Sequence, residues 1–117
     1  MGKGILLEKS YKFALRMVRL YTYLCNERHE YVLSKQALQD GTQIGAHIKE
    51  AQQAEIKSVF IQEMSIALRK ASRTGYWLQL LRDGEYLDNK EFDSIHTDCE
   101  ELSKILTATL KTSKSRA

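Results

Sequence analysis

The segment LQDGTQIGAHIKEA, residues 38–51, repeats small and apolar residues at the spacing of an α-helix. The repeat starts a few residues earlier and proceeds in steps of three or four, through Leu33, Ala37, Gly41, Ile44, Ile48 and Ala51. Steps of this size place the side chains on one helix face, so we expect a helix over residues 31–52. Two glycines stand within this segment, and each costs a helix interior roughly 1 kcal/mol relative to alanine.

Gly41 and Gly45 are four residues apart and share one side of the expected helix. Small residues one turn apart let two helix backbones approach closely, and the stronger dispersion attraction between them offsets the cost in helix propensity. We therefore expect close packing at this pair, against a helix of the same bundle or of a neighbouring subunit. The alternatives are a weak or kinked helix and a flexible loop.

Three further segments have the same period, over about residues 7–27, 55–82 and 88–111, followed by a polar tail at 112–117. The first contains an apolar stripe of Phe13, Ala14, Met17, Val18, Tyr21, Leu24 and Cys25. Gly84 suits the left-handed position after the third helix. Asp88 and Glu91 form a capping-box pattern before the fourth, with Leu87 and Phe92 placed as a hydrophobic staple.

The chain has 117 residues and no proline, which suits one domain of long helices. Four amphipathic helices joined by short loops predict an all-α, up-down-up-down antiparallel four-helix bundle over residues 1–117.

The composition of the chain argues against a membrane-spanning, secreted or cysteine-bound metal protein. The net charge is +3, which permits an acidic partner without requiring one. No apolar run approaches the ~20 residues that cross a bilayer, and no secretory signal is present, so we expect a cytoplasmic protein without a membrane role. Cys25 and Cys99 lack the spacing of a metal motif and are expected as reduced core residues.

Residues 30–51 and the segment FIQEMSIALRKASRTGYWLQLL, residues 60–81, resemble the small bacterial four-helix-bundle proteins. That family includes proteins encoded in intervening sequences of 23S ribosomal RNA genes and is related to the accessory variability proteins of diversity-generating retroelements. The shared residues of the first segment are Leu33, Gln36, Gly41, Thr42, Ile44, Gly45, Ala46, Glu50 and Ala51. Those of the second are Ser65, Ile66, Ala67, Leu68, Ala71, Tyr76, Trp77 and Leu78.

The resemblance implies a four-helix bundle that assembles as a homopentamer. For the retroelement relatives, it also implies a basic surface that contacts nucleic acid and a reverse transcriptase. The chain departs from the family pattern at several charged positions. Gln39 and Asp40 replace an Arg-Ser pair, and Lys70 and Arg73 stand where glutamates are expected. Positive charge has therefore moved from the second helix to the third.

A row of four cations forms the first candidate nucleic-acid site. Its members recur at i, i+3, i+7 and i+10 of the first helix, opposite the apolar stripe: Lys9, Lys12, Arg16 and Arg19. The row spans about 15 Å, comparable to several phosphate spacings, and Tyr23 extends it with a ring for stacking. The alternative is a solvated helix face.

A second basic group lies on the third helix and consists of Arg69, Lys70 and Arg73. Pairing with acids of the fourth helix is the alternative for this group. Nearby Trp77 is expected in the bundle core, at a subunit interface or on a stacking surface.

The sequence contains no clear catalytic or metal-binding motif. The nearest approaches to a metal pattern are Asp93-x-x-His96 and His47-x-x-Glu50, and neither has the repeated Glu-x-x-His form of a di-metal bundle. We expect no enzyme activity, metal or cofactor. The expected function is an oligomeric accessory or scaffold protein that binds RNA or DNA without sequence preference, or a nucleic-acid enzyme such as a reverse transcriptase. A purely structural protein–protein adaptor is the alternative.

Overall fold

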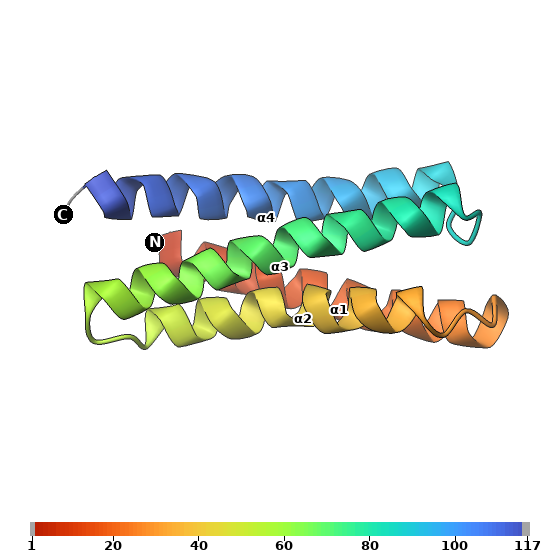
Figure 1. Cartoon of the computed structure of the whole chain (residues 1–117), viewed down its shortest axis with the longest axis horizontal. Coiled ribbons are helices and arrows are strands. Elements are labelled where there is room, and N and C mark those ends of the chain that lie inside the picture. The colour runs from red at the N-terminus through yellow and green to blue at the C-terminus, as the bar shows by residue number, and fades with distance from the viewer. Residues whose placement is uncertain (1, 116–117) are drawn as a thin grey trace.

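The computed structural model describes residues 2–115 as four long helices (Figure 1). They are α1 (Gly2–Glu27), α2 (Leu33–Gln52), α3 (Lys57–Asp83) and α4 (Asn89–Ser115). Successive helices run in opposite directions, so α1 begins and α4 ends at the same end of a rod measuring 47 × 21 × 20 Å. The expected all-α bundle is confirmed, and no strand occurs between residues 2 and 115.

Helix boundaries differ from the expectation mainly at the two ends of the chain. The first helix begins at Gly2, ahead of the expected Leu7, and α4 continues to Ser115. Most of the expected polar tail is therefore helical, and residues 116–117 lie outside the described part. Polar residues such as Lys111 and Lys114 extend α4 because a helix exposed at its end needs no apolar stripe.

The core runs along the axis of the rod and draws on all four helices. From α1 and α2 it takes Leu6, Phe13, Met17, Leu24, Ala37, Ile44, Ile48 and Ala51. From α3 and α4, and the turn between them, it takes Met64, Ala67, Ala71, Leu78, Leu81, Leu87, Phe92, Ile95, Cys99, Leu102, Leu106 and Leu110. The spacing predicted most of these positions because burial follows the helical period.

Four residues of the expected first stripe lie outside the buried core, among them Ala14 and Tyr21, which are half-buried. Val18 is 45% exposed, and Cys25 is only half-buried. Residues 13, 17 and 24 already complete the inward face of α1, so position 18 points outward together with Tyr11 and Leu15, which are also exposed. The buried stripe of α1 is therefore narrower than the apolar pattern predicts.

The two glycines of α2 pack against α1 of the same chain. A Cβ atom added at Gly41 would lie 2.6 Å from Cγ of the buried Met17, and one at Gly45 would lie 3.1 Å from Oγ of the buried Ser10. Both glycines are within an uninterrupted α2, so the loop alternative is wrong. Their absent side chains let α1 and α2 approach at two successive turns.

The four helices pack in a ring, and its weakest contact lies between α1 and α4. Two grooves follow this α1/α4 seam. One has a volume of about 480 Å³ and is lined by Leu20, Tyr23 and Ile95 among others. None of the helices in the described part is apolar over a length that could span a membrane.

Glu30 organises the turn between α1 and α2. Its carboxylate accepts hydrogen bonds from the backbone N–H groups of Val32, Leu33 and Ser34 at 3.1, 2.9 and 2.7 Å, and so caps the start of α2. Burial raises the pKa of Glu30, but these N–H groups together lower it by more, so the net pKa lies below its usual value.

The turn between α3 and α4 differs from the expectation in one detail. Gly84 has a φ of −80°, and Glu85 is the residue in the left-handed region, with a φ of 69°. The expected Asp88 cap is confirmed, because its Oδ1 accepts the Glu91 N–H at 2.7 Å, and both staple residues, Leu87 and Phe92, are buried.

We expect Gly41→Ala to lower the free energy of unfolding by roughly 1–2 kcal/mol, since the new methyl group must displace the buried Met17 side chain. Gly75→Ala is the matched control, because its Cβ would meet only ordinary contact, 3.6 Å from Nε2 of His96. That control should gain up to about 1 kcal/mol from helix propensity. Urea unfolding of both variants measures the difference, and equal gains would contradict the close approach.

Glu30→Gln should lower the free energy of unfolding by about 1 kcal/mol at pH 7. The stabilisation by Glu30 is complete above the pKa of an unfolded glutamate, about 4.3, and is lost as the pH falls through the lower folded-state pKa. The difference between wild type and variant should therefore shrink as the pH is lowered below about 4.3 in urea titrations. Glu55→Gln, at an exposed position before α3, should show no such convergence.

Candidate functional site

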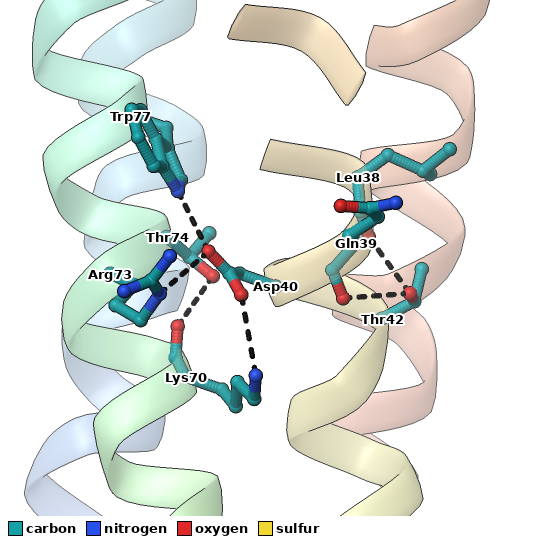
Figure 2. Close-up of polar contacts among 8 residues, drawn as sticks. All are labelled: Leu38, Gln39, Asp40, Thr42, Lys70, Arg73, Thr74 and Trp77. Carbon is teal, nitrogen blue, oxygen red and sulfur yellow. Dashed lines mark hydrogen bonds and ion pairs between the residues drawn. The ribbon is translucent and has the colours of Figure 1, made fainter. Parts of the chain in front are cut away.

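A buried carboxylate lies between α2 and α3, in contact with polar groups of α3. Asp40 projects from α2, and its side chain is 6% exposed. Its Oδ2 accepts hydrogen bonds from Trp77 Nε1 at 2.7 Å and from Arg73 Nε at 3.1 Å, while Lys70 Nζ lies 3.7 Å from Oδ1. Figure 2 shows these three side chains of α3 converging on Asp40. We call these four residues the Asp40 cluster.

The Asp40 cluster satisfies a charge that would otherwise be costly to bury. A carboxylate removed from water needs donors or cations close to both oxygens, and the three groups of α3 supply them. The cluster holds one acid and two bases, so its formal charge is +1. Its positive side faces outward, because the Arg73 side chain is 57% exposed.

Arg73 has donors left over. Only its Nε bonds to Asp40, and its two terminal nitrogens donate to no other residue between 2 and 115. Its guanidinium carbon lies 6.0 Å from the centre of the Trp77 ring, which adds a cation–π contact. The fixed guanidinium can therefore bind a planar or tetrahedral anion at the surface of α3.

The second basic group finds its partner on α2. Lys70 and Arg73 pair with Asp40, and not with the acids of α4 that were the alternative. Arg69, one turn earlier, is exposed and has no carboxylate within 4.0 Å in the described part of the chain.

The basic row of α1 consists of Lys9, Lys12, Arg16 and Arg19. Only some of these side chains lie on the side of the helix that faces away from the core. Lys9 lies 3.3 Å from Glu101 and Arg16 lies 2.8 Å from Asp98, so both turn toward α4. Residues seven apart return to nearly the same side of a helix, and at positions 9 and 16 that side is the α1/α4 seam.

Two members of the row remain exposed. Lys12 lies 3.7 Å from Glu8 on the same helix. Arg19 has no carboxylate within 4.0 Å among residues 2–115. Tyr23 is 44% exposed and lines the same groove as Arg19. The free positive charge of α1 is therefore smaller than the row of four suggested.

Trp77 lies at the edge of the core, partly buried and partly at the surface. Its ring is half-buried against the core, its N–H is bonded to Asp40, and Tyr76 meets it edge-on at 5.2 Å between ring centres. A contact of Trp77, Gly41 or Gly45 with another subunit stays a prediction.

Two histidines and one cysteine, His47, His96 and Cys99, contribute to the packing of the bundle. His47 bonds to Glu63 at 2.7 Å across α2 and α3, and the His96 ring stacks on Phe92. Within residues 2–115, no three metal-ligating side chains come together. Burial raises the pKa of Cys99 to about 12, with the nearby Glu100 charge adding to the effect, so its thiol stays protonated at neutral pH.

The roles of Asp40 and Glu30 were not predicted from the sequence. The comparison with the family pattern identifies Asp40 only as a replacement of serine. Asp40 also stands three residues after Ala37 and four before Ile44, and so borders the apolar stripe of α2. An acid at such a position was a signal for pairing with a base of another helix. Glu30 precedes the start of α2 by too many residues to resemble an ordinary N-cap.

Comparison with known proteins places the chain in a family. The family model described as 23S rRNA-intervening sequence protein matches residues 3–108. A crystal structure of a protein with unknown function from the S23 ribosomal protein family of Bacteroides thetaiotaomicron VPI-5482 superposes with a TM-score of 0.93. It is 44% identical, and the match covers 95% of this chain and 99% of that one. No curated protein matches.

We expect Asp40→Ala to lower the free energy of unfolding by roughly 2–4 kcal/mol, because it leaves the Trp77 N–H without an acceptor and Lys70 without a counter-charge. Asp40→Asn should lose less, since its amide oxygen can still accept from Trp77. Urea unfolding followed by circular dichroism measures both. Asp93→Ala, at an exposed acid of α4, is the control and should change stability by less than about 0.5 kcal/mol.

Proposed function

Because the chain belongs to the family of 23S rRNA-intervening sequence proteins, we propose that it is a non-enzymatic scaffold that presents basic helix faces to nucleic acid. The proposed scaffold is a ring of identical subunits, five in number as the family resemblance implies. A nucleic-acid enzyme such as a reverse transcriptase is the proposed second partner, and the proposed location is the cytoplasm.

The observation that supports the proposal is a set of outward-facing arginines without a carboxylate of their own. Arg19 on α1 and Arg69 on α3 have no acid within 4.0 Å in residues 2–115, and Arg73 shares Asp40 with Lys70. Guanidinium groups bind phosphate oxygens through paired donors, and such contacts carry no base-sequence information. The expected binding is therefore independent of sequence.

The acids of the chain are unevenly distributed, and two of them, Asp88 and Glu91, line the same groove as Arg19. Five acids belong to α4, and two of those five pair with Lys9 and Arg16 at the α1/α4 seam. Over residues 64–82, α3 contains no acid at all. A strand of nucleic acid lying on α3 would meet cations without an interleaved carboxylate from that helix.

Exposed apolar residues on α1 support the proposed self-assembly. Tyr11, Leu15 and Val18 are 65%, 38% and 45% exposed and lie on one outward face of the helix. Contiguous exposed apolar side chains on a helix commonly mark a protein–protein contact. In a cyclic ring each subunit repeats the same arginines, so a modest group becomes a large positive surface.

The same apolar face favours the second candidate function, a protein–protein adaptor without a nucleic-acid role. The two functions differ in their response to salt. Phosphate binding releases counterions and weakens steeply as salt increases, whereas an apolar contact does not.

We expect the protein to bind labelled RNA and DNA at about 50 mM salt and to lose roughly tenfold or more in affinity at about 200 mM. The combined change Arg19→Gln, Arg69→Gln and Arg73→Gln should weaken binding by a further factor of about ten or more and flatten the salt dependence. Fluorescence anisotropy gives both quantities. Light scattering on the same samples gives the subunit number.

A matched control removes three positive charges from α4, at the exposed Lys90, Lys111 and Lys114. Glutamine at these positions changes the net charge equally but should leave most of the affinity. Equal losses in the two triple variants would contradict a defined basic face. Absence of binding at low salt, with assembly intact, would favour the adaptor.

A further inference from the structure

The outer face of α3 combines two arginines with an exposed aromatic ring. Arg69, Arg73 and Tyr76 stand at i, i+4 and i+7, and all three are exposed. They occupy about 10 Å along the helix axis, which is the length of a few nucleotides. We call these three residues the α3 face.

The Asp40 cluster fixes two members of the α3 face. Asp40 bonds Arg73 through Nε and leaves the terminal nitrogens free at the surface. It also holds Trp77, whose ring meets Tyr76 at an interplanar angle of 66°. Figure 2 shows Arg73 and Trp77 reaching the same carboxylate from successive turns of α3. One buried acid therefore positions a phosphate-binding group directly and an aromatic ring through its neighbour.

Tyr76 is open for stacking. It is 56% exposed even though it touches Trp77 on one side. On its α4 side it lines a shallow recess with Glu100 and Lys104, whose opposite charges offset each other. A polynucleotide backbone is therefore favoured on the other side of the ring, where Arg73 and the α2 surface lie.

Stacking on Tyr76 requires a base whose face is free. Bases in a duplex are stacked on one another, whereas bases in a single strand can turn onto an aromatic side chain. Resting on the function proposed above, we propose that the α3 face is a single-stranded nucleic-acid site. Tyr76 stacks on one base, Arg69 and Arg73 bind the adjoining phosphates, and Asp40 is the positioning residue that holds Arg73 in place.

The first test compares a labelled oligothymidylate with a duplex of equal length at about 50 mM salt. Tyr76→Ala should weaken single-strand binding by roughly tenfold and leave duplex binding unchanged. Tyr76→Phe keeps the ring and should retain the affinity. Tyr31→Ala removes a tyrosine of nearly the same exposure, 57% against 56%, from the turn between α1 and α2 and should have no effect on either ligand. Unchanged single-strand affinity in Tyr76→Ala, or an equal loss in Tyr76→Phe, would overturn the proposal.

The second test uses Asp40→Asn, verified as folded by circular dichroism. This change adds one positive charge to the protein, so unspecific electrostatics alone would tighten binding to any polyanion. Loss of Arg73 positioning should instead weaken single-strand binding by about threefold or more, with duplex binding unchanged or tighter. Tighter binding of both ligands would overturn the positioning role. If Asp40→Asn does not fold, the Tyr76 pair still decides the stacking.

The outcomes separate this inference from the function on which it rests. Failure to bind either oligonucleotide at low salt contradicts the nucleic-acid function as a whole. Salt-dependent binding that ignores Tyr76 and treats duplex and single strand alike contradicts the α3 face alone. Trp77 is the single tryptophan of the chain, so quenching of its fluorescence by oligothymidylate reports occupancy beside Tyr76 without a label.

Discussion

Asp40 has to balance its charge inside the bundle, because its carboxylate is almost entirely removed from water. Its partners come from α3, which supplies an indole N–H, a guanidinium and an ammonium group. Satisfying the acid thus sets which side of α3 meets α2. It also sets what α3 exposes, since Arg73 and the aromatic pair follow from that orientation. The polar joint between these two helices links the packing of the bundle to its surface chemistry.

The contact between α1 and α2 depends on close packing of small residues. Gly41 and Gly45 give room to Met17 and Ser10, so these two helices are joined by small residues, while α2 and α3 are joined by charge. The α1/α4 seam is also crossed by charged pairs, Lys9–Glu101 and Arg16–Asp98, but these are partly exposed. Exposed pairs contribute little to stability, which agrees with the grooves found along that seam. The cations that serve this seam are poorly available to a polyanion, whereas those of α3 remain available.

The helical period was enough to predict the four helices, their antiparallel order and most core positions, since burial of one face of a helix is a local property of its sequence. The period could not show that Val18 points outward, because an apolar residue just outside the stripe looks the same as one inside it. The orientation of Lys9 and Arg16, the cap formed by Glu30 and the left-handed Glu85 all depend on how neighbouring elements meet. The Asp40 cluster joins α2 to residues of α3 that are 33 and 37 positions away, so spacing within one helix could not identify the partners of the acid.

The departures from the family pattern gain a physical meaning from this contact. The family resemblance implies an Arg-Ser pair at positions 39–40 of α2 and glutamates at 70 and 73 of α3. In this chain the acid is on α2 and the two bases are on α3, and they meet at 3.1 and 3.7 Å. The family pattern has a serine at position 40, so it lacks the buried acid that binds these two bases in this chain. The acid of the Asp40 cluster is buried on α2, whereas Arg73 is exposed on α3. The net charge of the cluster is therefore positive at the surface, beside Tyr76. For this reason the α3 face is better suited to a polyanion than the basic row on α1 is.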